Sequence, residues 1–346
     1  MSLSRRGNSK MSQLVMWRRA RRPRNARSAR RTAILGAAWV LAAAMVALGA
    51  LRLTGATTHT WQIRLLSVSP ILFLPAWPLA GIAAVRRHWA LMAVAIAVAG
   101  AELSWVGPQV RPWASAPAAT SPARLRIFDA NVSQSNRDLT GLAGEIRAAR
   151  PQVVTLEELT PQAAASLEGT GVMDRFGYRL VRIAFGAGGM GLWSSLPLAA
   201  ASSWEDGGGQ SELQASVRLG GKSIEINAVH VFAPLGSGQP RRWRQQLAAL
   251  GVHLRAERGL VVVAGDFNAS ADLPQFRSIL HDGLSDGAVL AGDGWQMTLP
   301  RNQSWVIPYL RLDHVLVSSG LTVTRFRTGN DRGSDHRVLV TDIAPD

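Results

Sequence analysis

The chain has 346 residues, of which 47% are hydrophobic and 18% charged, so it is neither a disordered protein nor a fibrous repeat. It contains no cysteine, which excludes a disulfide scaffold, a thiolate zinc site and a cysteine nucleophile. The net charge of +15 lies in the first third: residues 1–122 carry sixteen Lys/Arg against one acid, Glu102, whereas residues 123–346 carry 22 of each sign. The basic excess therefore says nothing about the larger C-terminal part.

The N-terminus is predicted to be a basic tail followed by a membrane-spanning helix. Eleven Lys/Arg precede residue 32 with no acid among them, so residues 1–32 are expected to be solvated or to face lipid head groups. Ala33–Leu51 is nineteen residues without a charge, enough for a helix rising about 1.5 Å per residue to cross a hydrocarbon core. A cleaved secretory signal is the alternative, but it would not explain the two later apolar stretches.

Two further apolar stretches complete the predicted membrane region, residues 33–106, with about three transmembrane helices. Leu65–Val85 is uncharged between two arginines, and its prolines are better tolerated in membrane helices than in soluble ones. Trp89–Val106 is interrupted by Glu102, so a re-entrant or interfacial segment is the alternative for this third stretch.

The positions of the arginines predict the orientation. Positive charges are retained on the cytoplasmic side, which places the tail and Arg86-Arg87 inside. Three spans then put everything after the third one outside, so we expect a multi-pass protein of the cell membrane with an extracytoplasmic C-terminal domain. Residues 107–122 have the Pro/Ala/Ser composition of a linker, and a catalytic domain is expected over residues 123–346.

From residue 123 the pattern changes to short β-rich runs separated by glycine and polar turns. Helical spacing occurs at residues 139–149 and near Arg241–Arg255. Strands are predicted at Leu125–Phe128, Val153–Leu156, Tyr178–Phe185, Gly191–Ser194, Leu213–Leu219, Ser223–Val231, Leu260–Ala264, Leu312–Val317, Leu321–Phe326 and Arg337–Ile343. The number of strands favours an α/β fold with two packed sheets and outer helices.

Polar residues recur at the ends of these predicted strands, where open sheets bind ligands. Taken singly, each has an ordinary structural explanation as a turn former, helix-start acid or strand-end cap. Their succession along the chain indicates a functional site instead, and its members are Asn131, Glu158, His230, Asp266, Asn268, Asp313, Asp335 and His336.

The motifs around these residues resemble those of the endonuclease/exonuclease/phosphatase superfamily. This superfamily includes pancreatic-type deoxyribonucleases, abasic-site endonucleases, neutral sphingomyelinases and inositol-polyphosphate phosphatases. The resemblance covers about residues 123–344, and its specificity comes from the order and spacing of the motifs rather than from any one of them. They are Asn131-Val132, Pro151 to Glu158, Val229-His230, Gly265-Asp266-Phe267-Asn268, Leu312-Asp313-His314 and Ser334-Asp335-His336.

The resemblance implies a four-layer α/β/β/α sandwich, here preceded by an α-helical transmembrane region, with the site at the mouth between the sheets. It implies a metal site at Asn131, Glu158 and Asp335, with Glu158 as the main ligand. It also implies catalytic roles for five residues. Asp266 would orient or deprotonate water, Asn268 would hold a phosphate oxygen, His336 oriented by Asp313 would contact the phosphate, and His230 would act on the phosphate or the leaving oxygen.

The residue chemistry agrees with these implied roles. Carboxylate and amide oxygens suit a hard cation such as Mg²⁺ or Mn²⁺, and phosphoester cleavage needs such a cation, an activated water and stabilisation of phosphoryl charge. One departure concerns Ser133, which stands where abasic-site enzymes have an aspartate. It weakens both a two-metal assignment and the abasic-site interpretation.

Two other patterns receive structural interpretations. Gly186–Gly191 satisfies G-x-G-x-x-G, but Leu192–Pro197 continues as a strand and stops rather than forming a helix, so no dinucleotide or other cofactor-binding site is predicted. Arg241, Arg242 and Arg244 are interpreted as a solvated helix face, with phosphate contact as the alternative. His314 is interpreted as a surface or packing residue.

The predicted function is a membrane-anchored, divalent-metal-dependent hydrolase of phosphoester bonds, of phosphodiesterase or nuclease type. Its partners would be a phosphoester substrate, either nucleic acid or a lipid head group, and the lipid bilayer; no obligate protein partner is indicated. The balanced charge of residues 123–346 argues mildly against tight binding of duplex DNA. The alternatives are a lipid phosphodiesterase or phosphatase of the same fold, and an inactive membrane-anchored binding module.

Overall fold

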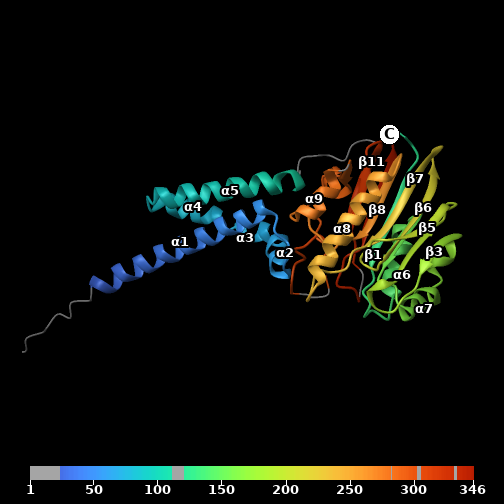
Figure 1. The fold of residues 1–346 in the computed structure, drawn as a ribbon, viewed down its shortest axis with the longest axis horizontal. Helices are drawn as coiled ribbons and strands as arrows, with labels where there is room; N and C mark the ends of the chain where they lie inside the picture. The colour runs from blue at the N-terminus through green and yellow to red at the C-terminus, as the bar shows by residue number, and fades with distance from the viewer. Residues whose placement is uncertain (1–23, 111–120, 282, 302–304, 331–332) are drawn as a thin grey trace, which may run out of the picture.

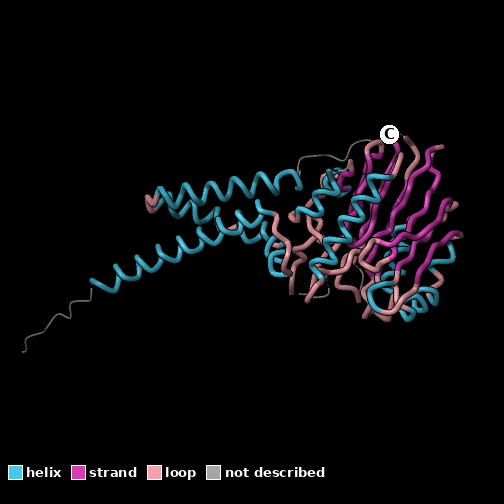
Figure 2. Tube along the Cα trace, in the orientation of Figure 1, coloured by secondary structure: helices cyan, strands magenta, loops and turns pink. Residues whose placement is uncertain are grey.

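The computed structural model describes residues 24–110, 121–281, 283–301, 305–330 and 333–346. A group of helices at the N-terminal side leads into an α/β sandwich that contains every described strand (Figures 1 and 2). The helices extend away from one side of the sandwich (Figure 1).

The N-terminal group contains five helices in the described residues. By length and composition α1, over Ser28–Thr54, and α5 could each cross a membrane, and a third span exists only if α2 and Ser69–Val85, bent by 65°, count as one. α4 packs alongside α5, whereas α1 contacts them toward its C-terminal end and diverges toward its N-terminal end (Figure 1). The helices are α1 (Arg24–Thr54), α2 (Thr60–Ser67), α3 (Ser69–Phe73), α4 (Ala76–Val85) and α5 (Trp89–Val110).

The predicted second span, Leu65–Val85, is not a single helix. Its first residues end α2, and the chain then bends before α3 and α4 continue. Pro70 lies in the first turn of α3 and Pro75 precedes α4, and a proline ends a preceding helix because it lacks the N–H and clashes with the previous turn.

The predicted tail and the predicted linker each overlap a helix of the structure. α1 already begins at Arg24, so residues 24–32 of the tail are helical, and α5 runs to Val110, so the first residues of the predicted linker 107–122 are helical too. Residues 1–23 and 111–120 lie outside the described residues. Glu102 in α5 is buried and accepts a hydrogen bond of 2.9 Å from the Trp77 indole, which explains how an acid fits in this apolar helix.

The sandwich consists of two six-stranded sheets. The first has the order β11-β12-β1-β2-β4-β3 and contains β1 (Leu125–Asn131), β2 (Val153–Glu157), β3 (Tyr178–Arg182), β4 (Met190–Ser194), β11 (Leu321–Thr328) and β12 (Leu339–Pro345). The second has the order β5-β6-β7-β8-β10-β9 and contains β5 (Ala199–Glu205), β6 (Ser211–Leu219), β7 (Lys222–His230), β8 (Leu260–Asp266), β9 (Leu284–Asp286) and β10 (Asp313–Ser318).

The helices of the sandwich cover the outer faces of the two sheets. α6 and α7 pack on the first sheet, and α8 and α9 pack on the second. Their bounds, with those of the short elements, are α6 (Thr140–Ala149), α7 (Pro161–Gly169), η1 (Val172–Arg175), η2 (Gly186–Gly188), α8 (Gln239–Ala256), α9 (Pro274–His281) and α10 (Gly287–Leu290).

Successive side chains of a strand point to opposite faces of its sheet, and each face packs against a different layer. In β1, Leu125 and Ile127 face the second sheet and join a core with Ile226 of β7, whereas Phe128 faces outward and packs with Leu142 of α6. The result is the predicted four-layer α/β/β/α sandwich, which is confirmed.

Sequence patterns missed β5, β9 and the helices α7, α9 and α10. β5 is an exposed edge strand whose alanines and serines have weak β-propensity, and β9 and α10 are only a few residues long. Such elements form because neighbouring strands or helices offer partners, which a local pattern does not reveal.

The helix α2 joins the N-terminal group to the sandwich. Ile63 and Leu66 are 3% and 0% exposed and belong to the same apolar cluster as Trp243 of α8. The Thr60 hydroxyl donates to the carbonyl of Pro234 at 3.0 Å. α2 is thus part of the outer layer of the sandwich.

Candidate active site

The candidate site forms where strand ends from both sheets meet. β1 and β2 are parallel and pair Asn131 with Glu157, while β7 and β8 are parallel and pair His230 with Asp266. β10 runs antiparallel to β8 and begins with Asp313 opposite Asp266. Each parallel pair therefore presents its carboxyl ends at the same edge, and the two edges face one another across the sandwich.

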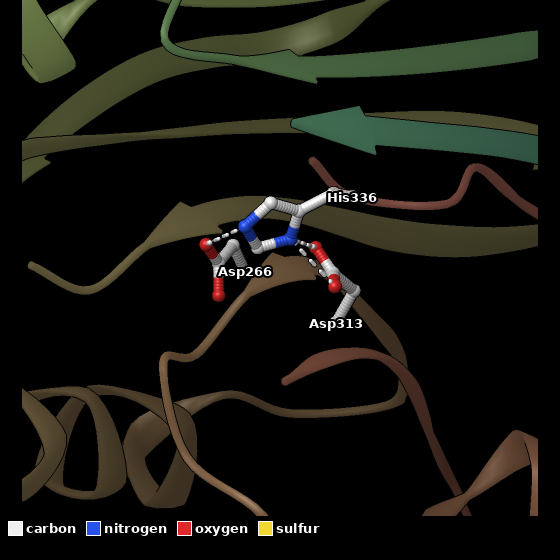
Figure 3. A group of neighbouring side chains, drawn as sticks. All are labelled: Asp266, Asp313 and His336. Atoms are coloured by element: carbon white, nitrogen blue, oxygen red, sulfur yellow. Dashed lines mark hydrogen bonds and ion pairs between the residues drawn. The ribbon is translucent and has the colours of Figure 1, made fainter. Parts of the chain in front are cut away.

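His336 lies between two carboxylates (Figure 3). Its Nδ1 is 2.9 Å from Asp313 Oδ2, and its Nε2 is 3.8 Å from Asp266 Oδ2. Because an ionised carboxylate can only accept, Nδ1 carries the hydrogen in that bond. Burial alone would lower the pKa of His336, but Asp313 and Asp266 more than offset it and raise the pKa to about 10. The ring thus presents a positive Nε2–H toward Asp266.

The loop that carries His336 is held to the first sheet by Ser334. Its hydroxyl donates to the carbonyl of Asn131 at 2.6 Å and accepts from the backbone N–H of His336 at 3.0 Å. One buried serine therefore links a strand end of the first sheet to the histidine.

Asp266 is the buried centre of the site. Its Oδ1 accepts from the backbone N–H of Asn268 at 2.8 Å, and its Oδ2 accepts from the amides of Asn131 and Asn268 at 3.1 and 3.0 Å. Burial, followed by the charge of Asp313, raises the pKa of Asp266 well above its ordinary value. A carboxylate made basic in this way is suited to accept a proton.

Glu158 follows β2 in a left-handed conformation, with φ of 58°, and this turn directs its side chain toward the cavity. One carboxylate oxygen accepts from the Asn131 amide at 3.3 Å and the other from the backbone N–H of Gln134 at 2.6 Å. Asn131 itself is 1% exposed and contacts both Glu158 and Asp266. It therefore connects the two carboxylates from behind.

His230 faces the same point from the second sheet. Its Nδ1 lies 3.0 Å from the carbonyl of Ala187, in the glycine-rich segment, and its Nε2 lies 3.8 Å from Glu158. Burial lowers the pKa of His230, against the charge of Glu158. A neutral ring that donates through Nδ1 to Ala187 leaves Nε2 without a hydrogen, so Nε2 can accept a hydrogen bond or a proton from a group in the cavity.

These side chains open into one cavity of roughly 1320 Å³. Glu158, His230, Asp266, Asn268, Asp335 and His336 line it. Asn131 and Asp313 lie directly behind this lining and are bonded to it. All eight residues singled out in the sequence therefore lie at one place, while their individual roles stay predictions.

The donor set suits a divalent cation. Three carboxylates, those of Glu158, Asp266 and Asp335, line the cavity, and hard cations prefer such oxygen ligands. The most compact possible metal-binding group is Asp266, Asp313 and His336, with ligand atoms within 4.8 Å of one another. Asp313 does not line the cavity and is bonded to His336, so the carboxylates that face the cavity are those of Glu158, Asp266 and Asp335.

Two further acids were missed in the sequence. Asp129 and Glu157 are buried behind the site, and neither oxygen of Glu157 has a hydrogen-bond partner among the described residues when both acids are ionised. Burial raises the pKa of Glu157 well above its ordinary value and that of Asp129 to about 7. One proton shared between the two carboxyl groups would join Asp129 Oδ2 to one oxygen of Glu157. The sequence signal for these residues is an acid at an inward position of a buried strand.

Two arginines line the cavity although the sequence patterns gave them other roles. Arg242 was interpreted as part of a solvated helix face, but it lines the cavity and stacks over Phe232 at 4.0 Å. Arg64 was interpreted as a flank of a membrane span, but it lines the cavity too. For Arg242 the cavity favours phosphate contact, the alternative to a solvated helix face. Arg64 still flanks the apolar stretch, and its place in the cavity depends on how α2 packs.

Comparisons with known proteins agree with this geometry. The model of the Endonuclease/Exonuclease/phosphatase family matches residues 127–336. No curated protein matches the chain. Among solved structures, D. rerio TDP2 complexed with a single-strand DNA product has a TM-score of 0.54 at 18% identity, over 64% of this chain and 99% of that one.

Two bacterial structures are similar to the same extent. An endonuclease/exonuclease/phosphatase from Beutenbergia cavernae DSM 12333 has a TM-score of 0.50 at 19% identity, over 65% of this chain and 72% of that one. A family protein from Leptotrichia buccalis C-1013-b has a TM-score of 0.52 at 17% identity, over 64% and 99%. At these identities the likeness shows the fold, whereas the family model covers well over half of the residues and ends at His336. The chain belongs to the endonuclease/exonuclease/phosphatase family.

Proposed function

We propose that the protein is a membrane-anchored, divalent-metal-dependent hydrolase that cleaves phosphoester bonds by attack of water on phosphorus. The observation that supports this most directly is the convergence of Asp266, His230 and the His336–Asp313 pair on one cavity that Glu158 also lines. An inactive binding module would have no requirement for two oriented imidazoles beside a basic carboxylate.

In the proposed mechanism each side chain has a separate task. Asp266 accepts the proton of the attacking water, and Asn268 and Asn131 hold its carboxylate in place through the bonds to Oδ1 and Oδ2. His336, kept positive by Asp313, stabilises charge on the phosphoryl oxygens. Nε2 of His230 acts on the phosphate or on the leaving oxygen.

Glu158 and Asp335, with Asn131 behind them, would hold Mg²⁺ or Mn²⁺ at the cavity. When bound, such a cation neutralises phosphoryl charge and lowers the pKa of water. Anchoring through three spans, which are α1, the segment Ser69–Val85 and α5, with the N-terminus in the cytoplasm and the sandwich outside, is part of the same proposal.

The test is a metal-requirement assay on the full chain with a p-nitrophenyl phosphodiester, plasmid DNA and sphingomyelin in parallel. We expect hydrolysis of at least one substrate with Mg²⁺ or Mn²⁺, its loss with chelator, and its recovery when the metal is returned. Hydrolysis that persists in chelator, or an Asp266→Asn variant as active as the parent, contradicts the proposal.

A further inference from the structure

The active-site cavity is not formed by the sandwich alone. One wall consists of Glu158, Asp266 and His336, whereas α2 and the residue after it contribute Arg64, Leu65, Ser67 and Val68 to the lining. The helix that connects two apolar segments of the chain is therefore a wall of the catalytic cavity.

α2 is held in this position by buried contacts. Besides the packing of Ile63 and Leu66, the side-chain amide of Gln275 donates to the Thr57 hydroxyl at 2.7 Å. At the end of α1, Arg52 forms an ion pair of 2.7 Å with Asp272, and the two side chains are 5% and 7% exposed. The distance between α2 and the catalytic residues is thus set by the fold.

The position of α2 relative to a bilayer follows from the proposed anchoring, on which this inference rests. The uncharged segment of α1 ends at Leu51, and the next apolar segment begins after Ser67, so α2 lies between the ends of two membrane segments. A helix is about 10 Å across, so the cavity on its other side lies within roughly one helix diameter of the membrane surface.

Exposed apolar side chains contribute to the cavity lining and to the segment that leads into it. Leu65, Leu235 and Tyr309 line the cavity and are 38%, 53% and 40% exposed. Trp305 and Ile307, just before Tyr309, are 84% and 86% exposed. A polar substrate that diffuses in from water does not need such side chains, whereas aromatic and aliphatic side chains are typical of the interface between lipid and water.

The same cavity contains cationic groups suited to a phosphate. Arg64 is exposed on α2, and Arg242 of α8 also lines the cavity and stacks over Phe232. Guanidinium groups bind phosphate oxygens through charge-assisted hydrogen bonds. Exposed apolar side chains, arginines and the candidate catalytic residues in one cavity match the apolar chains and the phosphate of an amphiphile.

We propose that the substrate is a phosphoester of a membrane lipid, drawn from the leaflet on the side of the sandwich, with its acyl chains at the exposed apolar side chains and its phosphate at Asp266 and His336. Water forms the new bond to phosphorus, the ester bond between phosphorus and one alcohol breaks, and the leaving oxygen takes up a proton. A diester then yields a phosphomonoester and an alcohol. The neutral charge of residues 123–346 disfavours a nucleic acid as the occupant.

The first test compares substrates with the full chain reconstituted in vesicles. A panel of long-chain phospholipids and sphingomyelin is offered in the bilayer, and short-chain lipids with the same head groups, a p-nitrophenyl phosphodiester and plasmid DNA are offered in solution. We expect turnover of at least one bilayer lipid to exceed that of its short-chain counterpart by about tenfold or more, since tethering raises the local substrate concentration.

Variants of the α2 wall sharpen this test. Leu65→Gln should lower the ratio of vesicle to soluble turnover, because Leu65 is the α2 side chain proposed to contact the acyl chains. Arg64→Gln should instead lower the turnover of both substrates by about tenfold, the value of one charge-assisted hydrogen bond to the phosphate that they share. Arg179→Gln is the matched control, because Arg179 is exposed on the edge strand β3 and does not line the cavity. It should leave the ratio and both turnovers unchanged.

A second test does not depend on turnover. Because the chain has no cysteine, Leu65→Cys and Arg179→Cys each provide a single site for a spin label. In vesicles the label at position 65 should be protected from a water-soluble relaxation agent and reached by oxygen from the lipid, whereas the label at position 179 should show the reverse.

The outcomes separate the two proposals. If no substrate is hydrolysed in a metal-dependent way, the proposed function is wrong and so is this inference. Hydrolysis of DNA or short-chain esters at rates equal to or above those of bilayer lipids, or a fully water-accessible label at position 65, overturns the lipid substrate and leaves the proposed function intact.

Discussion

The side chain of Asp266 combines burial with four polar neighbours, which are Asn131, Asn268, His230 and His336. Burial makes its carboxylate basic, while the amides keep it oriented. His336 is the converse case, because the neighbouring carboxylates overcome burial and keep it charged. The pKa values of both groups are raised, so Asp266 is suited to take up a proton while His336 stays charged near neutral pH.

Substitution of these groups should separate chemistry from folding. We expect Asp266→Asn and His336→Ala each to lower kcat by about 10²–10⁴-fold, because general acid–base groups contribute that much. Glu158→Gln should mainly raise the metal concentration needed for half-maximal activity. Turnover against metal concentration and thermal unfolding check this, with the exposed Asp174→Asn as control. Near parental turnover of the Asp266 or His336 variant would refute the assigned roles.

A second buried charge cluster, centred on Asp286, stabilises the second sheet. Its carboxylate lies 2.9 Å from both Arg311 Nη2 and His314 Nδ1 and accepts from the backbone N–H of Ala288 at 2.9 Å. His314 is buried here, which confirms its interpretation as a packing residue. Burial alone would raise the pKa of Asp286, but Arg311 and His314 more than offset it and lower the pKa to about 2.

This cluster predicts an acid-dependent loss of stability. A carboxyl group whose pKa is lower in the folded state than in the unfolded state, where it is about 3.9, stabilises the fold above about pH 4 and loses that contribution as the pH falls toward about 2. The amount is about 2 kcal/mol. Denaturant unfolding of the parent and of Asp286→Asn between about pH 2 and pH 6 should show a smaller pH dependence in the variant, and equal slopes would contradict the prediction.

At the scale of elements, α1, α2 and α5 are attached to the sandwich by polar contacts as well as by apolar packing. Asp272, before α9, receives Arg52 from α1 at 2.7 Å and the side-chain amide of Gln109 from α5 at 3.4 Å. Arg52 also stacks over Trp105 at 4.9 Å. A single buried carboxylate thus joins two candidate spans to the sandwich.

Replacing only Arg52 of the Arg52–Asp272 ion pair should lower the free energy of unfolding more than replacing both residues. Arg52→Met leaves the Asp272 charge buried without its partner and should lower the free energy of unfolding by about 3–5 kcal/mol. The double variant Arg52→Met with Asp272→Leu should recover part of this loss. Arg182→Met, in an ion pair with Glu205 whose side chains are 49% and 67% exposed, is the control and should cost under about 1 kcal/mol.

Denaturant unfolding of the full chain in detergent measures these free energies. If the double variant is less stable than Arg52→Met alone, Arg52 and Asp272 do not stabilise the fold as a pair.

At the scale of the whole molecule, the helices and the sandwich share one apolar core. A fragment of residues 123–346 lacks Ile63 and Leu66, whose burial contributes about 1.5–3 kcal/mol each. We therefore expect this fragment to melt at a lower temperature than a fragment of residues 56–346, and to expose apolar surface that binds a hydrophobic dye. Equal melting temperatures would mean that α2 is dispensable for the domain.

The proposed orientation has its own test. Reporters active only in the cytoplasm or only outside it, fused after residue 88 and after residue 122, should give opposite results, cytoplasmic at 88 and external at 122. Cytoplasmic activity at residue 122 would mean that α5 does not cross the membrane.

Much of the catalytic half could be predicted from the sequence because its signals are local. Alternation in β1, the helical spacing over residues 139–149 and the polar residues at strand ends all reflect short-range geometry that recurs wherever such a strand or helix is buried. The order of those polar residues then carried the family resemblance, and all eight of them lie at the cavity. The apolar segments likewise followed from hydropathy alone.

The tertiary structure was needed wherever a residue's role depends on a distant partner. Leu66 has the same apolar character in a membrane span as in a domain core, and only its contact with Trp243 distinguishes the two. Arg64 is an ordinary flanking charge until α2 turns toward Asp266, and Glu157 is an ordinary glutamate until Asp129 lies beside it in the interior. These partners are far apart along the chain, and the residues around each of them do not indicate that the two are in contact. Packing and burial depend on the whole chain, so only the tertiary structure shows these contacts.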